Sequence, residues 1–125
     1  MKTLLCFFLI LALSFSQTVP AGGWKDQDPD ELNKSPFLKQ YLDVGVSQFI
    51  QQAMKSNEIS TPDMSVKIVY TVSTQVVNGF TVKFNLELVE NDGKLHHGVD
   101  LVVYSAPGAS TKKLISYKLN YSSRY

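Results

Sequence analysis

The sequence predicts an α+β fold in which one long helix packs against an antiparallel β-sheet. Residues 35–56 repeat apolar side chains every three or four positions, which is typical of an amphipathic helix. Residues 66–90 then alternate apolar and polar side chains on either side of Asn78-Gly79, which indicates a β-hairpin. Residues 99–121 have the pattern of a second hairpin. A chain of 125 residues, 44% of them hydrophobic, has the size of one globular domain.

Residues 1–16 have the features of a secretory signal peptide. Lys2 supplies the positive charge, a run of apolar residues follows, and small residues precede the expected cut after Ser16. A cut after Ala21 is the alternative, but the chemistry of the site favours the first and leaves residues 17–125 as the mature domain. The apolar run is too short for a membrane anchor, so we expect an extracellular protein with no membrane partner.

Charge and cysteine content exclude several classes of protein. Cys6 is the only cysteine and lies in the signal peptide, so the mature chain has no disulfide, no nucleophilic thiol and no thiolate metal ligand. Without Lys2 the basic and acidic residues balance, and no basic stripe indicates a nucleic-acid partner. Adjacent His96 and His97 would point to opposite faces of a strand, so we expect them at an exposed loop or edge, with no shared metal and no cofactor.

The expected helix has clear start signals. Ser35 is a candidate N-cap, and Pro36 suits the first helical position. Gly45 inside the helix costs about 1 kcal/mol relative to Ala, which suggests that it allows close approach to the sheet. The stripe predicted to face the sheet comprises Leu38, Tyr41, Leu42, Val46, Phe49, Ile50 and Ala53.

The first hairpin requires an odd number of loop residues if its apolar faces are to match. A two-residue loop at Asn78-Gly79 would set Phe84 opposite a polar residue, whereas a loop of three or five residues corrects this. A three-residue loop needs glycine in its left-handed position, which Gly79 supplies. The predicted cross-strand pairs are Phe84 with Val72, Leu86 with Tyr70, and Leu88 with Ile68.

Val76 and Val77 then lie at or near the tip of this hairpin. Two adjacent valines at an exposed tip add little to folding but offer apolar area for docking. The alternative is that one of the valines folds back onto the sheet.

The stretch Gln75-Val76-Val77-Asn78-Gly79 fits the Q-x-V-x-G pattern of the cystatin superfamily, which inhibits papain-like cysteine proteases. The order of the other segments also matches: Gly22-Gly23, a long helix, this hairpin, and a second hairpin whose turn contains Pro107. The chain therefore resembles a cystatin over essentially its whole length after the leader. Secreted cystatins usually carry disulfides, so this cysteine-free chain is more similar to a stefin-like core with an export signal.

The resemblance implies a sheet of about five strands and a wedge made of three segments. These are a trunk bending at Gly22 or Gly23, the first hairpin tip at residues 75–79, and the second tip at Pro107 and Gly108. The wedge of a monomer would block the groove of a cathepsin-type protease, with no catalytic residue of its own. Gly108 stands where cystatins usually have Trp, and the lost contact weakens binding by about 1–3 kcal/mol.

Ser56-Asn57-Glu58 resembles the S-N-D motif with which some secreted cystatins inhibit legumain, an asparagine-specific protease. Glu58 replaces the Asp of that motif. We favour the alternative that Asn57 is an ordinary helix C-cap.

Two further residues carry simple expectations. Trp24 is expected to anchor the first strand in the core rather than to lie at the rim. Asn120 begins a glycosylation sequon, Asn120-Tyr121-Ser122, that we place in an exposed C-terminal tail.

Two other functions are compatible with the sequence. One is a secreted cystatin-fold protein that binds a partner or acts as an antimicrobial without inhibiting proteases, although the balanced charge argues against membrane disruption. The other is a small secreted enzyme, which would need a polar pocket that the apolar strand faces do not indicate. An inhibitor is the function that we favour.

Overall fold

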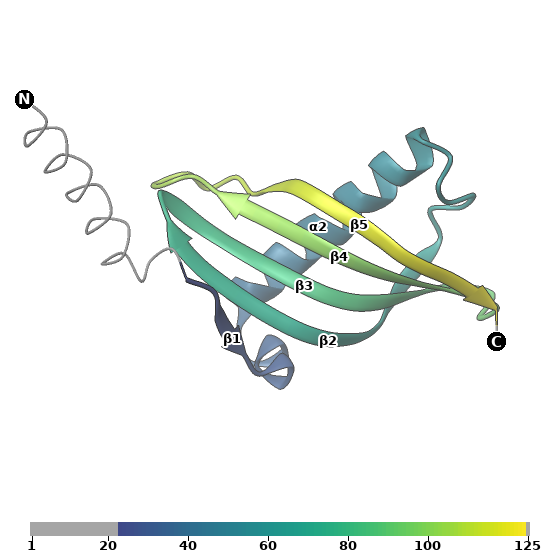
Figure 1. Ribbon diagram of the computed structural model, residues 1–125, viewed down its shortest axis with the longest axis horizontal. Helices are drawn as coiled ribbons and strands as arrows, with labels where there is room; N and C mark the ends of the chain where they lie inside the picture. Colours follow the sequence, from purple (N-terminus) through teal and green to yellow (C-terminus); the bar gives the residue numbers. More distant parts are fainter. Residues whose placement is uncertain (1–22, 125) are drawn as a thin grey trace, which may run out of the picture.

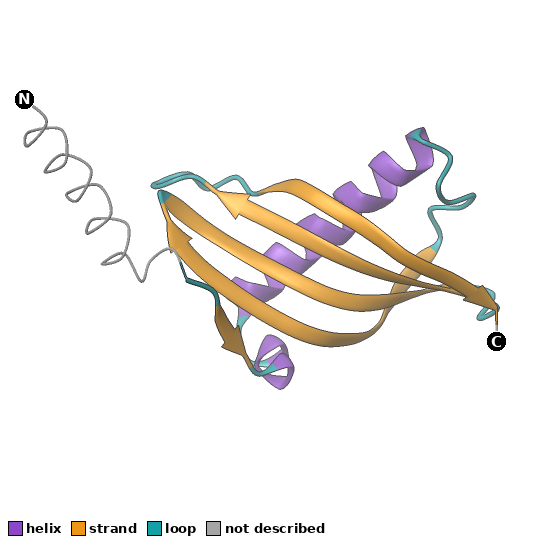
Figure 2. Ribbon diagram, in the orientation of Figure 1, coloured by secondary structure: helices purple, strands orange, loops and turns teal. Residues whose placement is uncertain are grey.

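The computed structural model describes residues 23–124, which form one long helix against a five-stranded antiparallel sheet (Figures 1 and 2). The elements in chain order are strand β1 (Lys25–Gln27), the 3₁₀ helix η2 (Pro29–Asn33), helix α2 (Pro36–Lys55), and strands β2 (Met64–Val77), β3 (Gly79–Glu90), β4 (Leu95–Ser105) and β5 (Lys113–Arg124). The strands follow one another across the sheet in sequence order. The predicted α+β class is confirmed, while the expected signal peptide and Gly22 lie outside the described residues.

Helix α2 begins where the local sequence predicts and lies close to the sheet. The Ser35 hydroxyl accepts a hydrogen bond of 3.2 Å from the amide of Leu38, and Pro36 is the first helical residue. Gly45 is buried, and a Cβ at this position would come within 2.8 Å of Cγ2 of Val103 on β4. Glycine therefore permits the close packing that was expected. Within residues 23–124, no helix is long and apolar enough to cross a membrane.

The hydrophobic core lies between α2 and one face of the sheet. Most of the predicted helical stripe is buried there, while Val46 and Ile50 are only partly covered. A fully buried side chain of this size stabilises the fold by about 1.5–3 kcal/mol. The main core residues are Leu38, Tyr41, Leu42, Phe49 and Ala53 from the helix, with Val72, Val82, Phe84, Leu86, Leu88, Val99, Leu101, Val103 and Leu114 from the strands.

Strand β2 departs from the prediction because two irregularities interrupt its pairing with β3. The observed pairs are Phe84 with Val72, Leu86 with Val69, and Leu88 with Val66, so only the first of the three predicted pairs is correct. Each irregularity changes which residues oppose one another and resets the alternation of faces, as β-bulges do. Ile68 and Tyr70 therefore do not enter the core and are 46% and 47% exposed. Bulges also bend a strand, and Figure 1 shows the sheet curving across the helix.

The histidines are buried in a strand, so their expected place in an exposed loop or edge is wrong. Strand β4 begins at Leu95, earlier than predicted, and includes both residues. Nδ1 of His96 lies 2.7 Å from a carboxylate oxygen of Glu87, and Nε2 of His97 lies 3.0 Å from one of Glu90. Each ring thus meets its own carboxylate on the neighbouring strand, β3, which is why both histidines can be buried.

The C-terminal residues continue the sheet instead of forming a tail. Strand β5 reaches Arg124, so Asn120 lies within a strand, with an exposed side chain. The expectation of an exposed position is confirmed, whereas the expectation of a tail is wrong.

Candidate functional site

The two hairpin tips lie side by side at the end of the sheet opposite the C-terminus (Figure 1). The first tip joins β2 to β3 at residues 77–79, and the second joins β4 to β5 through residues 106–112. Continuing the antiparallel pairing of β1 with β2 places Gly23 level with Val76. We call this end of the sheet, with Gly23 and both tips, the tip end.

The first tip presents two valines to solvent. Val76 is 56% exposed and Val77 is 40% exposed, so neither is folded into the interior. Val77 pairs with Gly79 across the hairpin, as a three-residue loop requires, and Gly79 has a φ of 122° that residues with a side chain rarely adopt. Gln75 is half-buried in β2, and Asn78 is exposed at the turn.

Tyr104 of β4 contacts this first tip. Its hydroxyl donates a hydrogen bond to the carbonyl oxygen of Asn78. Gly79 lies against the tyrosine ring: a Cβ there would be 2.7 Å from both Cε1 and the hydroxyl oxygen of Tyr104, and 2.5 Å from the carbonyl oxygen of Ser105. Glycine is therefore required at position 79 by packing as well as by backbone conformation.

The second tip is a Pro-Gly turn without a large side chain. The amide of Ala109 donates to the carbonyl of Ala106 at 3.1 Å, with Pro107 and Gly108 between them. Gly108 has a φ of 72°, as the third residue of a type II turn requires. Within residues 23–124, no atom lies within 4 Å of a Cβ built at this glycine. The backbone conformation, and not lack of space, therefore selects glycine where the resemblance leads one to expect Trp.

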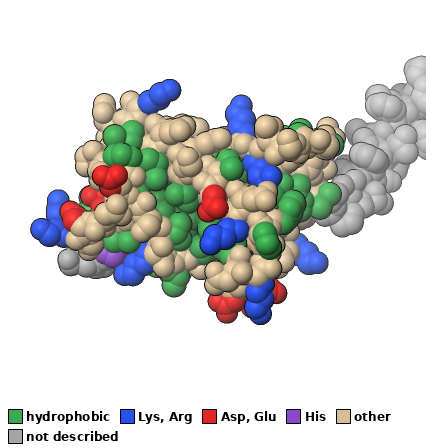
Figure 3. All heavy atoms as spheres, turned by 180° about the vertical axis from the view of Figure 1, so that it is seen from behind, with side chains coloured by type: hydrophobic (Ala, Val, Ile, Leu, Met, Phe, Trp, Pro, Cys, Tyr) green, Lys and Arg blue, Asp and Glu red, His purple; other side chains and the backbone are tan. Residues whose placement is uncertain are grey.

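A shallow hollow of about 580 Å³ separates the two tips from the start of α2. Phe37, Tyr41 and Phe80 line it with three mutually packed rings, whose centroids are 5.2, 5.5 and 5.6 Å apart. Phe37 is 52% exposed. Figure 3 shows the molecule from behind, with hydrophobic side chains exposed at several places on this face, including the right-hand end that carries the tips. Sequence reasoning did not identify Phe37 as a site residue, because it lies outside the apolar stripe of the helix. Its only sequence signal is that an aromatic residue stands close to the N-cap.

Trp24 lies at the surface, and its predicted place in the core is wrong. Its side chain is 42% exposed, and the ammonium group of Lys83 lies 4.8 Å from the ring centroid. The ring lies over Lys83, an exposed residue between the buried Val82 and Phe84 of β3, so Trp24 is on the face of the sheet turned away from α2 and the core. The aromatic ring is instead stabilised by a cation–π contact at the rim.

Asn57 lies at the C-terminal end of α2, away from the tip end, and it caps the helix. Its φ is 61°, and the amides of Asn57 and Glu58 donate back to carbonyls in the last turn of α2, as in a Schellman motif. Hydrogen bonds from the hydroxyls of Tyr117 and Ser56 lower the pKa of Glu58. The hydrogen bond between Tyr117 and Glu58 also raises the pKa of Tyr117. The C-cap interpretation is confirmed, and contact with legumain stays a prediction.

Comparison with known proteins finds a solved structure with a similar fold. No protein-family model matches the sequence, and no curated protein matches it. The structure is similar to the crystal structure of a salivary cystatin from the soft tick Ornithodoros moubata, with a TM-score of 0.55 and 22% sequence identity over 80% of this chain and 98% of that chain. The fold is cystatin-like. At this level of identity the likeness concerns the fold alone.

The cystatin-like fold brings most of the predicted contact residues to one end of the molecule. Residues 75–79, Pro107 and Gly108 belong to the two adjacent tips, and Gly23 lies level with them. Gly22 lies outside the described residues.

Proposed function

We propose that the protein is a secreted, reversible and competitive inhibitor of papain-like cysteine proteases of the cathepsin type. The observation that carries this proposal is the exposed apolar first tip, Val76-Val77, lying beside the second tip at one end of the sheet. The Q-x-V-x-G pattern and the cystatin-like fold support it. Such an inhibitor acts by filling the substrate groove and needs no catalytic group of its own.

The first tip is the main source of binding energy in this proposal. Val76 and Val77 each contribute up to about 1.5–3 kcal/mol if the protease buries them fully, before the costs of association. Gln75 and Asn78 flank them with amide groups that donate and accept hydrogen bonds. The second tip, at Pro107-Gly108, offers little apolar area, so the first tip and the trunk should dominate the affinity.

Titration of papain with the purified mature chain tests the proposal. We expect a stoichiometric loss of papain activity that competing substrate relieves. Gly79→Glu should weaken inhibition by about 100-fold or more, because it strains the first tip and removes the fit to the groove. Removal of the chain through Gly23 should also weaken it strongly.

Gly93→Glu provides the matched control. Gly93 is also a turn glycine with positive φ, at 77°, but it lies between β3 and β4 at the other end of the sheet. This variant should inhibit papain as the wild type does. An inert wild-type protein would contradict the proposal and favour a non-inhibitory secreted binding or antimicrobial protein, and turnover of a substrate would instead show an enzyme.

A further inference from the structure

We propose that Tyr104 is a positioning residue that holds the two hairpin tips together as one rigid surface. As far as inhibition is concerned, this inference rests on the proposed function. The hydroxyl of Tyr104 donates a hydrogen bond to the carbonyl of Asn78 in the first tip, while its own backbone belongs to β4, which ends at Ser105 immediately before the second tip. This side chain therefore connects the first tip to the strand that leads into the second tip.

The direction of the Tyr104 side chain follows from the alternation of β4. Val103 is buried, and its side chain meets Gly45 of α2, so the next residue points to the opposite face of the sheet. On that face Tyr104 is paired with Thr81 of β3, only two residues from the start of that strand at Gly79. The ring is thus placed to reach along β3 to the first tip.

The carbonyl that Tyr104 binds belongs to a residue that is not paired with a neighbouring strand. Asn78 is the single residue between β2 and β3, so its backbone is not paired across the hairpin. A tip built on an unpaired residue is free to change conformation unless another group holds it. The hydroxyl of Tyr104 supplies that group.

The same contact gives Gly79 a second reason to be glycine. A Cβ at position 79 would overlap the ring and hydroxyl of Tyr104 and the carbonyl of Ser105. Any side chain there must displace the ring and break its hydrogen bond to Asn78. The effects of changing Gly79 and Tyr104 should therefore be coupled rather than additive.

A tip that is fixed before binding does not have to be ordered during binding. Val76 and Val77 are exposed, so the core does little to hold them. Ordering side chains and loops at an interface reduces affinity, and preorganisation removes that cost. We therefore expect Tyr104 to strengthen inhibition without contacting the protease.

The test compares Tyr104→Phe with Tyr117→Phe. Each variant keeps its ring and loses one hydroxyl hydrogen bond, to Asn78 in the first case and to Glu58 in the second. We expect Tyr104→Phe to speed amide hydrogen exchange at Asn78 and Gly79 and to weaken papain inhibition, each by about five- to tenfold. Tyr117→Phe should change neither quantity.

A double-mutant cycle tests the coupling directly. Gly79→Ala alone should weaken inhibition because it displaces the ring of Tyr104. Adding Tyr104→Phe to Gly79→Ala should weaken it little further, since the hydrogen bond is already lost. Fully additive effects would show that the two residues act independently and would overturn the coupling.

The exchange measurement separates this inference from the proposed function. If the wild type inhibits papain and Tyr104→Phe changes neither exchange nor inhibition, the positioning role is wrong and the inhibitor assignment stands. If the wild type does not inhibit papain, the inhibitor assignment fails. In that case faster exchange at Asn78 in Tyr104→Phe still supports the positioning role, and unchanged exchange overturns it.

Discussion

The tip end leaves apolar side chains in solvent, whereas the other end of the sheet buries titratable ones. At the tip end, Phe37, Val76 and Val77 are each at least 40% exposed. At the opposite end, which we call the far end, Glu87, Glu90, His96 and His97 are each less than 10% exposed. Proteins in water usually bury apolar groups and expose charged ones. The tip end departs from this rule by exposing apolar groups, and the far end departs from it by burying titratable ones.

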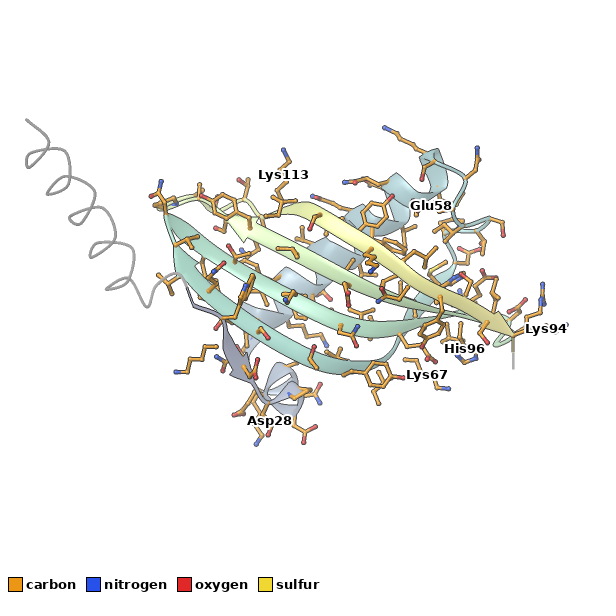
Figure 4. All side chains as sticks on the ribbon, viewed as in Figure 1. Asp28, Glu58, Lys67, Lys94, His96 and Lys113 are labelled. Carbon is orange, nitrogen blue, oxygen red and sulfur yellow. The ribbon has the colours of Figure 1, made fainter. Side chains whose placement is uncertain are left out.

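The far end shows what makes such a departure stable. Glu87 accepts hydrogen bonds from the hydroxyls of Tyr121 and Tyr70, and it lies 2.7 Å from His96 and 3.9 Å from the ammonium of Lys67. Figure 4 shows His96 and Lys67 at this same end of the sheet. Each of the four buried side chains, Glu87, Glu90, His96 and His97, has a polar partner within the molecule. At the tip end, nothing within residues 23–124 covers the exposed apolar side chains, as expected for a surface that contacts another protein.

The largest effect is expected from Glu87→Ala. This change leaves two tyrosine hydroxyls and the ring of His96 without their shared acceptor, and it should lower the free energy of unfolding by about 2–4 kcal/mol. Urea unfolding measures the loss. Papain inhibition by the folded fraction should be unchanged, because the far end does not contact the protease in our proposal.

Glu58→Ala is the control for that prediction. Glu58 also accepts a hydrogen bond from a tyrosine hydroxyl but is exposed, so its removal should cost much less stability. Equal losses for the two variants would mean that burial at the far end adds nothing to stability.

A smaller effect is expected from Phe37→Ala at the tip end. If the protease covers the hollow beside the tips, the loss of this half-exposed ring should weaken inhibition by about fivefold, or about 1 kcal/mol. Ile115→Ala on β5 is a matched control, because Ile115 is also 52% exposed. An equal change in the inhibition constants of both variants would exclude Phe37 from the contact.

The smallest effect is expected from pH. Hydrogen bonds from Tyr121 and His96 lower the pKa of Glu87 below its usual value of 4.5. The stabilisation by this carboxylate is therefore complete above about pH 4.5 and is lost as the pH falls through the lowered pKa. Urea unfolding between pH 7 and pH 3, compared with Glu87→Gln, should show the wild type losing its advantage only on the acid side. An advantage as large at the lowest pH as at pH 7 would contradict this assignment.

Local signals predicted the helix and the first tip because each depends on neighbouring residues. The cap at Ser35, the apolar stripe of α2 and the three-residue turn at Gly79 all follow from short sequence patterns. The geometry around Val76 and Val77 follows from that turn.

The errors arose where distant strands decide the outcome. In β2, the apolar residues at positions 66, 68, 70 and 72 alternate with mostly polar residues, and the pairing with β3 shows that Ile68 and Tyr70 face away from the core. His96 and His97 are buried because carboxylates on β3 receive them, which no local pattern records. The contact from Tyr104 to Asn78 spans 26 positions and was not foreseen for the same reason.

The open surroundings of Gly108 make the second tip a natural place to alter selectivity. Because no described residue packs against position 108, replacing or lengthening the Pro107-Gly108 turn should leave the core and the Tyr104 contact intact. Asparagine also tolerates positive φ, so a library that begins from Gly108→Asn and adds aromatic residues beside it would explore new protease targets without unfolding the scaffold.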